Sequence, residues 1–238
     1  MTRLAALTLG LAFSLSAFAV EEWRDADATK RIAITCDSPT GNLTGFPVLV
    51  KCVAGWAVPW ADISNGYVSF YDGGGTKLNY EADVAMAQSG DNTTFAYWVG
   101  QFNLYSAPSG DQNVIYMYYK KSNADTGTPA GNPTSVWNAN FVGVYHMSDS
   151  SGGAVDSTSS VNHMTKVGGT PTYGQIGAIG KAIGFAAAST EYVAIASCLT
   201  TGAPTTLSAW GNAAGTTNQA FVSICSDTWQ MIAACEAT

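Results

Sequence analysis

The stretch WNANFVGVYHM, residues 137–147, divides the chain into two parts. The residues before it, 122–136, are rich in glycine, proline, asparagine and threonine, a composition typical of a linker. Within the stretch, Val142, Val144 and His146 recur at every second position, as expected for a strand. We therefore interpret 137–147 as the start of a second β-module, with its first strand at 141–147, and 122–136 as the linker.

Upstream of the linker, residues 20–121 contain six short runs with strand-like patterning, several of which alternate apolar and polar residues. The sequence DGGGT, residues 72–76, joins two of the runs, and its glycines permit the positive φ of a tight hairpin. The last run is apolar or aromatic on both faces, as a central strand would be. The runs are residues 31–36, 47–53, 67–71, 78–84, 95–99 and 114–119.

The part after the linker, residues 137–238, also lacks amphipathic helices and contains further strand-like runs. Two segments rich in glycine are expected to form loops, 149–160 and 174–180. The predicted strands are residues 141–147, 182–185, 191–195, 206–210, 220–225 and 229–234. The fold class is therefore predicted to be all-β, with two β-sandwich or jelly-roll modules in tandem. The second is expected to be incomplete, because it is short for two sheets with such long loops.

The first 19 residues have the composition of a signal peptide. Arg3 supplies the positive charge, residues 4–15 the apolar segment, and AFA at 17–19 the cleavage site. The alternative, a membrane anchor, is disfavoured because the segment is shorter than the roughly 20 residues of a spanning helix. We expect a secreted, periplasmic or cell-surface protein without membrane insertion after cleavage.

The charge balance restricts the possible partners. The chain has 10 basic and 17 acidic residues, and charged residues make up only 11% of it. Nucleic acids and anionic membranes require a basic surface, so neither is an expected partner. Self-association stays open.

Five cysteines lie in the exported part, where disulfides persist. Cys36 and Cys52 fall in adjacent predicted strands, so a bridge between them is one hypothesis and two buried thiols are the other. Intact mass before and after reduction decides between them. No cysteine or histidine pair has the spacing of a zinc site.

Residues 20–121 resemble a bacterial domain of unknown function, DUF2341. The resemblance is carried by Trp23 and by residues 31–34, 43–50, 68–72, 77–81, 97–99 and 115–119. Residues 137–238 resemble concanavalin A-like, laminin-G-type sandwiches, through 136–137, 141–147, 156–158, 180–185, 192–193 and 207–210. These resemblances imply extracellular binding, often to glycans or cell-surface partners, in multidomain bacterial or phage proteins.

Few residues suggest catalysis. Glu81 and Asp83 alternate with Tyr80 and Ala82, which are expected to face inward, so we interpret the two acids as the solvated face of a hairpin strand. No nucleophile elbow of the form G-x-S-x-G is present, and His146 fits a core or interface histidine better than a catalytic base. We therefore expect no enzymatic activity.

Two candidate binding sites remain. Asp149, Asp156 and Asn162 lie in a glycine- and serine-rich loop and could bind calcium through oxygen ligands, or could instead cap turns. Trp56 and Trp60 flank a proline in a loop and could stack on sugar rings, or could pin the loop to the sandwich.

The remaining indoles, Trp98, Trp137 and Trp210, lie in strand patterns and are predicted to be core residues. Taken together, the sequence predicts a binding or adhesion module for carbohydrate or cell-surface ligands. The alternative is a structural or decoration subunit of a surface assembly or phage virion.

Overall fold

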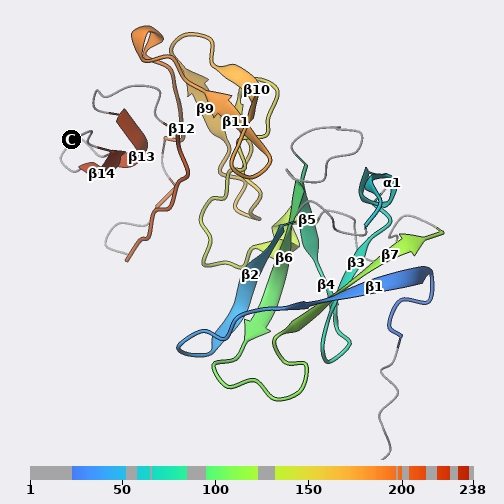
Figure 1. Ribbon diagram of the computed structural model, residues 1–238. Helices are drawn as coiled ribbons and strands as arrows, with labels where there is room; N and C mark the ends of the chain where they lie inside the picture. The colour runs from blue at the N-terminus through green and yellow to red at the C-terminus, as the bar shows by residue number, and fades with distance from the viewer. Residues whose placement is uncertain are drawn as a thin grey trace, which may run out of the picture.

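The protein consists of antiparallel β-sheets with almost no helix, as the computed structural model shows (Figure 1). The structure describes residues 23–51, 58–64, 66–84, 95–122, 132–196, 198–199, 204–212, 219–225 and 230–235. The all-β prediction is therefore confirmed. The predicted signal peptide, residues 1–19, lies outside the described residues, and no helix within them is long and apolar enough to cross a membrane.

Two sheets form a β-sandwich-like unit before the linker. The first has the order β1-β7-β3-β4, and the second the order β2-β6-β5. The bounds are β1 Ala28–Thr35, β2 Leu43–Lys51, β3 Ser69–Asp72, β4 Lys77–Leu78, β5 Tyr80–Val84, β6 Phe95–Leu104 and β7 Val114–Lys121. All six predicted runs form strands, and β7 lies between β1 and β3 as its two apolar faces predicted.

The predicted hairpin around residues 72–76 forms, but it is short. β3 pairs with β4 through Phe70 and Leu78, and the Thr76 amide donates to the Asp72 carboxylate at 2.7 Å. The predicted run 78–84 is not one strand, because the chain changes sheets at Asn79 and continues as β5, paired with β6. This change of sheet places β4 and β5 in opposite layers.

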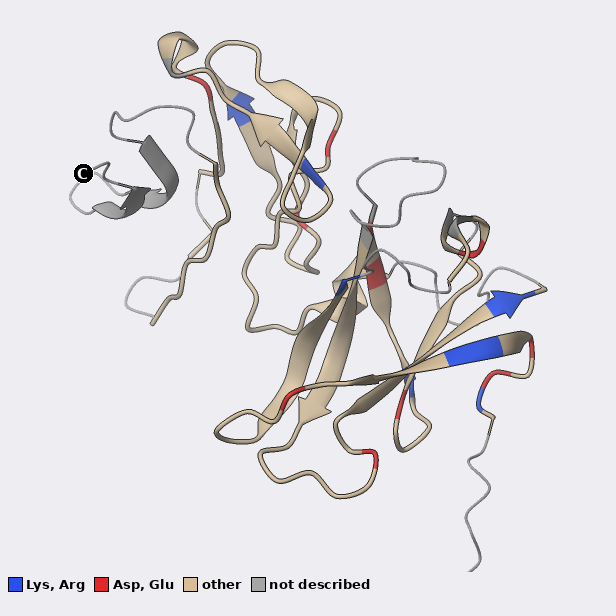
Figure 2. Ribbon diagram, in the orientation of Figure 1, with Lys and Arg blue, Asp and Glu red and all other residues tan. Residues whose placement is uncertain are grey.

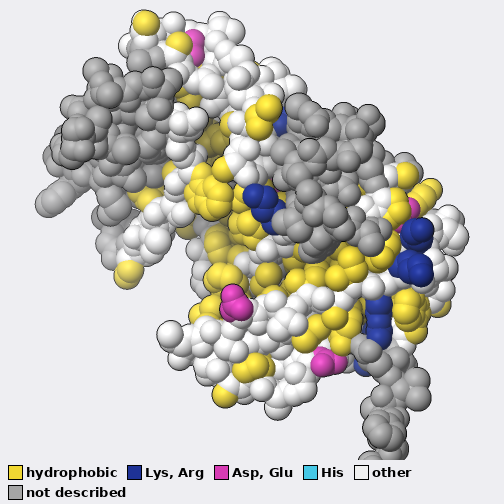
Figure 3. All heavy atoms as spheres, viewed as in Figure 1, with side chains coloured by type: hydrophobic (Ala, Val, Ile, Leu, Met, Phe, Trp, Pro, Cys, Tyr) yellow, Lys and Arg dark blue, Asp and Glu magenta, His cyan; other side chains and the backbone are white. Residues whose placement is uncertain are grey.

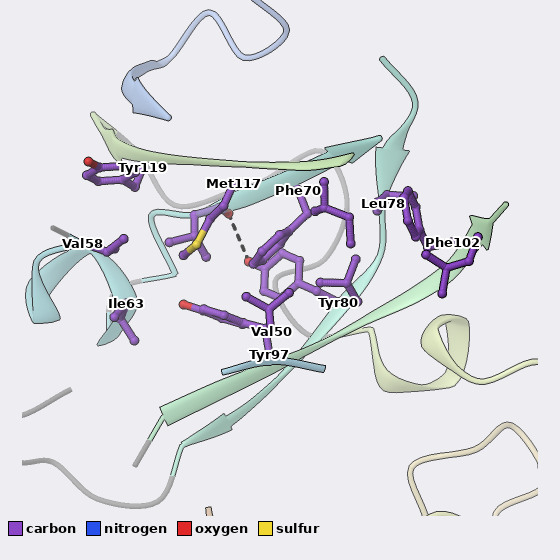
Figure 4. Close-up of a cluster of buried hydrophobic side chains, with 14 residues drawn as sticks. Val50, Val58, Ile63, Phe70, Leu78, Tyr80, Tyr97, Phe102, Met117 and Tyr119 are labelled. Carbon is purple, nitrogen blue, oxygen red and sulfur yellow. Dashed lines mark hydrogen bonds between the residues drawn. The ribbon is translucent and has the colours of Figure 1, made fainter. Parts of the chain in front are cut away.

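The core lies between these two sheets, and its apolar side chains point toward one another (Figure 4). The rings of Phe70, Tyr80 and Tyr97 meet edge to face at centroid distances of 5.0 to 5.5 Å, a favourable arrangement for aromatic pairs. The buried Tyr80 hydroxyl donates to the Val68 carbonyl at 3.2 Å. Val58 and Ile63, before and within the short helix α1 (Trp60–Ser64), contribute to the same core.

The segment before β1 is fixed to the outer face of the first sheet. Trp23 meets Tyr118 edge to face at 5.3 Å, and the Arg31 guanidinium lies 5.3 Å from the Trp23 ring. Beneath them, the Lys121 ammonium lies 2.8 Å from the Asp25 carboxylate, which also accepts a hydrogen bond from the Ser69 hydroxyl. Both side chains of this ion pair are almost fully buried.

The end of the predicted linker packs against the second sheet. Pro133–Val136 form one helical turn, α2, whose Val136 is completely buried. The Gln101 side-chain amide donates to the Ser135 carbonyl at 2.7 Å. The Val136 backbone lies so close to Gly100 of β6 that a β-carbon at Gly100 would overlap it.

Gly100→Ala is therefore expected to push α2 off the sheet and to lower the free energy of unfolding by about 1–3 kcal/mol, as overpacking does. Gly41→Ala is the matched control, because a β-carbon at Gly41 would meet no other atom within 4 Å. Chemical denaturation of both variants measures the difference, and equal stabilities would contradict the close approach.

After Trp137 the strands form smaller sheets. β12, β9 and β8 form one sheet in that order, and β10–β11 and β13–β14 form two hairpins. The bounds are β8 Gly153–Ala154, β9 Met164–Val167, β10 Thr172–Ile176, β11 Lys181–Gly184, β12 Tyr192–Ala194, β13 Gln219–Cys225 and β14 Gln230–Cys235, with a 3-10 turn, η1, at Ala187–Ser189.

Four of the six strands predicted here form: β11, β12, β13 and β14. The prediction for residues 141–147 is wrong, because only Tyr145 makes a β-bridge, to Asp156, and the Val144 amide bonds to the Asp156 side chain. Residues 206–210 are irregular. The expectation that residues 174–180 would not pair is also wrong, since β10 pairs with β11.

Burial differs sharply between the two parts. Among the described residues from 137 to 212, the buried apolar side chains are Trp137, Ala154, Pro171 and Ile183. Trp210, predicted to be a core residue, is 72% exposed, and that prediction is wrong, whereas Trp137 is buried. Two tandem sandwich modules are therefore not confirmed, and the second β-sandwich stays a prediction.

Candidate functional site

Two carboxylates on β5 face the region that follows the linker. Glu81 and Asp83 alternate along the strand and lie on the face opposite to Tyr80, whose ring belongs to the core. β5 runs toward the region after Trp137, which lies at the top of the picture, and its acidic segment is coloured red in Figure 2. The predicted solvated face is wrong, because the two carboxylate side chains are only 13% and 4% exposed. The strand is exposed at Ala82 instead, which was expected to face inward.

His146 lies between the two carboxylates. Its Nε2 is 3.0 Å from Glu81 Oε2, and its Nδ1 is 3.2 Å from Asp83 Oδ2. The imidazole side chain is 12% exposed. His146 is therefore an interface residue, as the sequence suggested, and it joins the region after Trp137 to β5.

Glu81 also receives two neutral donors. The Ser157 hydroxyl donates to Oε1 at 2.6 Å, and the Trp137 indole donates to Oε2 at 3.0 Å. The Trp137 ring in turn lies 5.3 Å from the ring of Trp98 on β6. We call Glu81, Asp83, Trp137, His146 and Ser157 the junction cluster.

The junction cluster shifts the pKa values of His146 and Glu81. Burial alone would lower the pKa of His146, but its hydrogen bonds to Asp83 and Glu81, and their negative charge, raise that pKa to about 9. Burial alone would raise the pKa of Glu81, but the hydrogen bond and charge of His146, with the donors Ser157 and Trp137, lower it. The cluster therefore favours an ion pair.

A cleft of about 280 Å³ opens beside the junction cluster. Its lining is mostly polar and acidic: Glu81, Pro133, His146, Ser148, Asp149, Val155, Asp156 and Ser157. The two side chains that could act in catalysis, His146 and Ser157, both contact Glu81. Ser157 donates to Glu81 rather than to His146, so no nucleophile–base pair of the Ser–His type is formed here.

Asp156, one of the candidate calcium ligands, organises the loop around the cleft. Its Oδ1 accepts from the amides of Val144 and Thr158 at 2.9 Å, and its Oδ2 from the Asn162 amide and the Thr158 hydroxyl at 2.8 Å. Burial alone would raise the pKa of Asp156, but these hydrogen bonds lower it. The carboxylate thus caps turns, as the alternative interpretation required.

The other two candidate ligands also make local bonds. Asp149 accepts from the Val155 amide at 3.2 Å, and the Asn162 side chain donates to the Val142 carbonyl at 2.7 Å. Within the part of the chain that the structure describes, no three His, Cys, Asp or Glu side chains converge as a metal site would require. Calcium binding at Asp149, Asp156 and Asn162 stays a prediction.

The remaining predicted residues are only partly described. Cys36 is half-buried, and burial raises the pKa of its thiol, whereas Cys52 lies outside the described residues. The disulfide stays a prediction. Trp60 begins α1, with its side chain outside the described set, and Trp56 lies outside it entirely, so their role in stacking also stays a prediction.

Exposed aromatic side chains are a second candidate feature. In the region after Trp137, Trp210 is 72% exposed, Tyr192 52% and Phe185 44%. On the face shown in Figure 3, hydrophobic side chains form a band across the middle, with few charged side chains beside it. An exposed indole or phenol leaves a large apolar area in water, so such side chains often mark contact surfaces.

Sequence reasoning missed the junction cluster as a unit. It treated Glu81 and Asp83 as one pair, considered Trp137 and His146 separately, and gave Ser157 no role in a site. The available signal was weak: a Glu-x-Asp pair on one strand face, and one of only two histidines in the chain. Nothing in the sequence pattern indicated that residues 137–157 would cover that face.

Comparison of the chain with protein-family models, with curated proteins and with solved structures gives no match in any of the three. The class that the fold defines is an all-β protein with a β-sandwich-like unit.

Proposed function

We propose that the protein is an exported, non-catalytic binding module for carbohydrate or cell-surface glycans. The observation that carries the proposal is the exposure of Trp210, Tyr192 and Phe185 in one region of the chain. The sandwich, by contrast, buries large aromatics such as Tyr97 and Phe70 almost completely. Stacking on a sugar ring removes the apolar face of an aromatic side chain from water while the sugar hydroxyls stay hydrated.

Other features support this proposal. The resemblances of residues 20–121 to DUF2341 and of 137–238 to laminin-G-type sandwiches imply extracellular binding, and the N-terminal segment resembles a signal peptide. The absence of catalysis is proposed because His146 and Ser157 are both engaged by Glu81.

Binding is tested by retention of the purified protein on a panel of insoluble polysaccharides, with calcium and with EDTA. Trp210→Ala and Tyr192→Ala are each expected to weaken retention about tenfold, since a lost stacking contact costs on the order of 1–1.5 kcal/mol. Ile176→Ala is the matched control, because Ile176 is 70% exposed and has no aromatic ring. Loss of retention only in EDTA would add the calcium site to the proposal.

Full retention by both aromatic variants would contradict the proposed site. No retention of the parent protein on any polysaccharide would contradict the glycan proposal itself.

The alternative, a structural or decoration subunit, has one observation in its favour. β10–β11 and β13–β14 are two-stranded sheets, so within the described residues each strand has an edge without a strand partner. Such edges can pair with a neighbouring copy. Sedimentation at micromolar concentration separates the two proposals, because a structural subunit forms a large assembly and a glycan-binding module stays small.

A further inference from the structure

His146 presents both ring nitrogens to carboxylate oxygens. An ionised carboxylate accepts hydrogen bonds but has no hydrogen to donate, so each of these contacts requires a proton on the histidine nitrogen. A neutral imidazole carries only one such proton. Both Glu81 oxygens already accept from other donors, Ser157 and Trp137, and these hydrogen bonds favour the ionised form of that carboxyl. The geometry therefore points to a doubly protonated ring.

We propose that His146 is an imidazolium whose charge fastens the region after Trp137 to the outer face of β5, and that loss of this charge detaches the region from the sandwich. The proposal does not depend on the function proposed above. It makes the attachment of the region after Trp137 depend on the charge of His146, in addition to the neutral contacts of Trp137 and Ser157.

Among the described side chains around His146, none is a cation that could take its place. β5 contributes Glu81 and Asp83, and the cleft beside the ring is lined by Asp149 and Asp156. The other neighbours are the indoles of Trp98 and Trp137, with ring centroids 6.2 and 6.0 Å from the imidazole. Deprotonation would therefore leave a nitrogen lone pair facing a buried carboxylate, an arrangement that repels.

A second segment of the region rests on the same strand. Gly180, at a φ of +61°, lies so close to Asp83 that a β-carbon there would overlap the carboxylate. Asp83 Oδ1 is buried and has no hydrogen-bond partner among the described residues, so Asp83 depends on His146 for its charge partner. Detachment at His146 thus also exposes the contact at Gly180.

The pH dependence follows from the direction of the two shifts. The pKa of His146 in the folded protein lies above its ordinary value, so its contribution is complete below about pH 6.5 and is lost as the pH rises through about 9. The pKa of Glu81 lies below its ordinary value, so its contribution is present above that value and is lost in acid. Attachment is expected near neutral pH and release on either side.

The protonation state is tested first, by nitrogen-15 NMR of the histidine rings. The chain has only two histidines, and a His163→Gln variant assigns the signals. His163 is an internal reference, since its Nδ1 accepts the Asp156 amide and carries no proton. We expect two protonated nitrogens on His146 at pH 7.5 and one after titration near pH 9. A single protonated nitrogen at pH 7.5 would overturn the proposal.

Detachment is tested by small-angle X-ray scattering and near-ultraviolet circular dichroism. His146→Gln at pH 7.5 is expected to enlarge the radius of gyration by about a tenth over the roughly 18 Å of a compact chain of this length. The signal of the stacked Trp98–Trp137 pair should change while the far-ultraviolet strand signal persists. His163→Gln should change neither.

The unsubstituted protein provides a second measurement that needs no variant. Raising the pH from 7.5 to about 9.5 should produce the same enlargement in it, and no further change in His146→Gln, because only the former has a charge to lose. A protein that stays compact at the higher pH, or an equal response of both proteins, would refute the proposed role of the charge.

Discussion

Asp156→Ala is expected to lower the free energy of unfolding by about 3–5 kcal/mol. The substitution removes the acceptor for the amides of Val144, Thr158 and Asn162 in a side chain that is 5% exposed. Each buried donor left without a partner costs roughly 1–3 kcal/mol, partly offset where water can reach it. The loss is measured by chemical denaturation at neutral pH.

Asp149→Ala is the control for this prediction. Asp149 accepts a single amide hydrogen bond, from Val155, and lies nearer to solvent, so its loss is expected to cost about 0.5–1.5 kcal/mol. Equal losses would contradict the central role of Asp156 in the loop.

The same pair of variants tests the calcium hypothesis. If Asp149, Asp156 and Asn162 bind calcium, millimolar calcium should raise the melting temperature, and both variants should abolish the rise. No shift of the parent protein in calcium would contradict the hypothesis.

Lys121→Met is expected to have a comparably large effect, a loss of about 3–5 kcal/mol, because it leaves the Asp25 carboxylate buried without its cation. The pair is 2.8 Å apart, with side chains 3% and 6% exposed, and it joins the segment before β1 to the end of β7. Replacing both residues, as Asp25→Asn with Lys121→Met, should cost less than the sum of the single changes.

The pH dependence gives an independent check on this ion pair. Burial alone would raise the pKa of Asp25, but the hydrogen bonds from Lys121 and Ser69 and the lysine charge lower it. The contribution of Asp25 is therefore present above its ordinary pKa and is lost as the pH falls through the lower value. The Lys121→Met penalty should shrink in acid, where the carboxyl can become neutral. A loss under about 1 kcal/mol at neutral pH would mean that the pair behaves like a surface ion pair.

The six runs predicted before the linker were predictable because each satisfies a local rule. Alternation in β1 and β2, two apolar faces in β7 and the DGGGT turn between β3 and β4 are all visible in short windows. The break at Asn79 was not visible, since the alternation of 78–84 continues unchanged across it. The chain changes sheets there because the residues before Asn79 pair with β3 and the residues after it pair with β6.

Prediction was poorer after Trp137, for a physical reason. Residues 141–147 have a strand pattern, but the Val144 amide bonds to the Asp156 carboxylate and the Val142 carbonyl to the Asn162 side chain, so backbone pairing is limited to the bridge at Tyr145 and the adjacent Ser157–Val144 hydrogen bond. Period-two alternation indicates which side chains share a face. It does not indicate which acceptor the backbone will use.

The features of the protein and its candidate site also divide into those that the sequence predicts and those that only the folded structure determines. The all-β class, the strands of the sandwich and the sparse, acidic charge follow from local patterning and composition, so the amino-acid sequence is enough to predict them. The burial of Glu81 and Asp83, the place of His146 between them and the exposure of Trp210 depend on the folded arrangement. The reason is that the outer face of β5 is buried only when residues more than 50 positions away in the sequence cover it. The charge of His146 is likewise stabilised only where the fold places it beside both carboxylates.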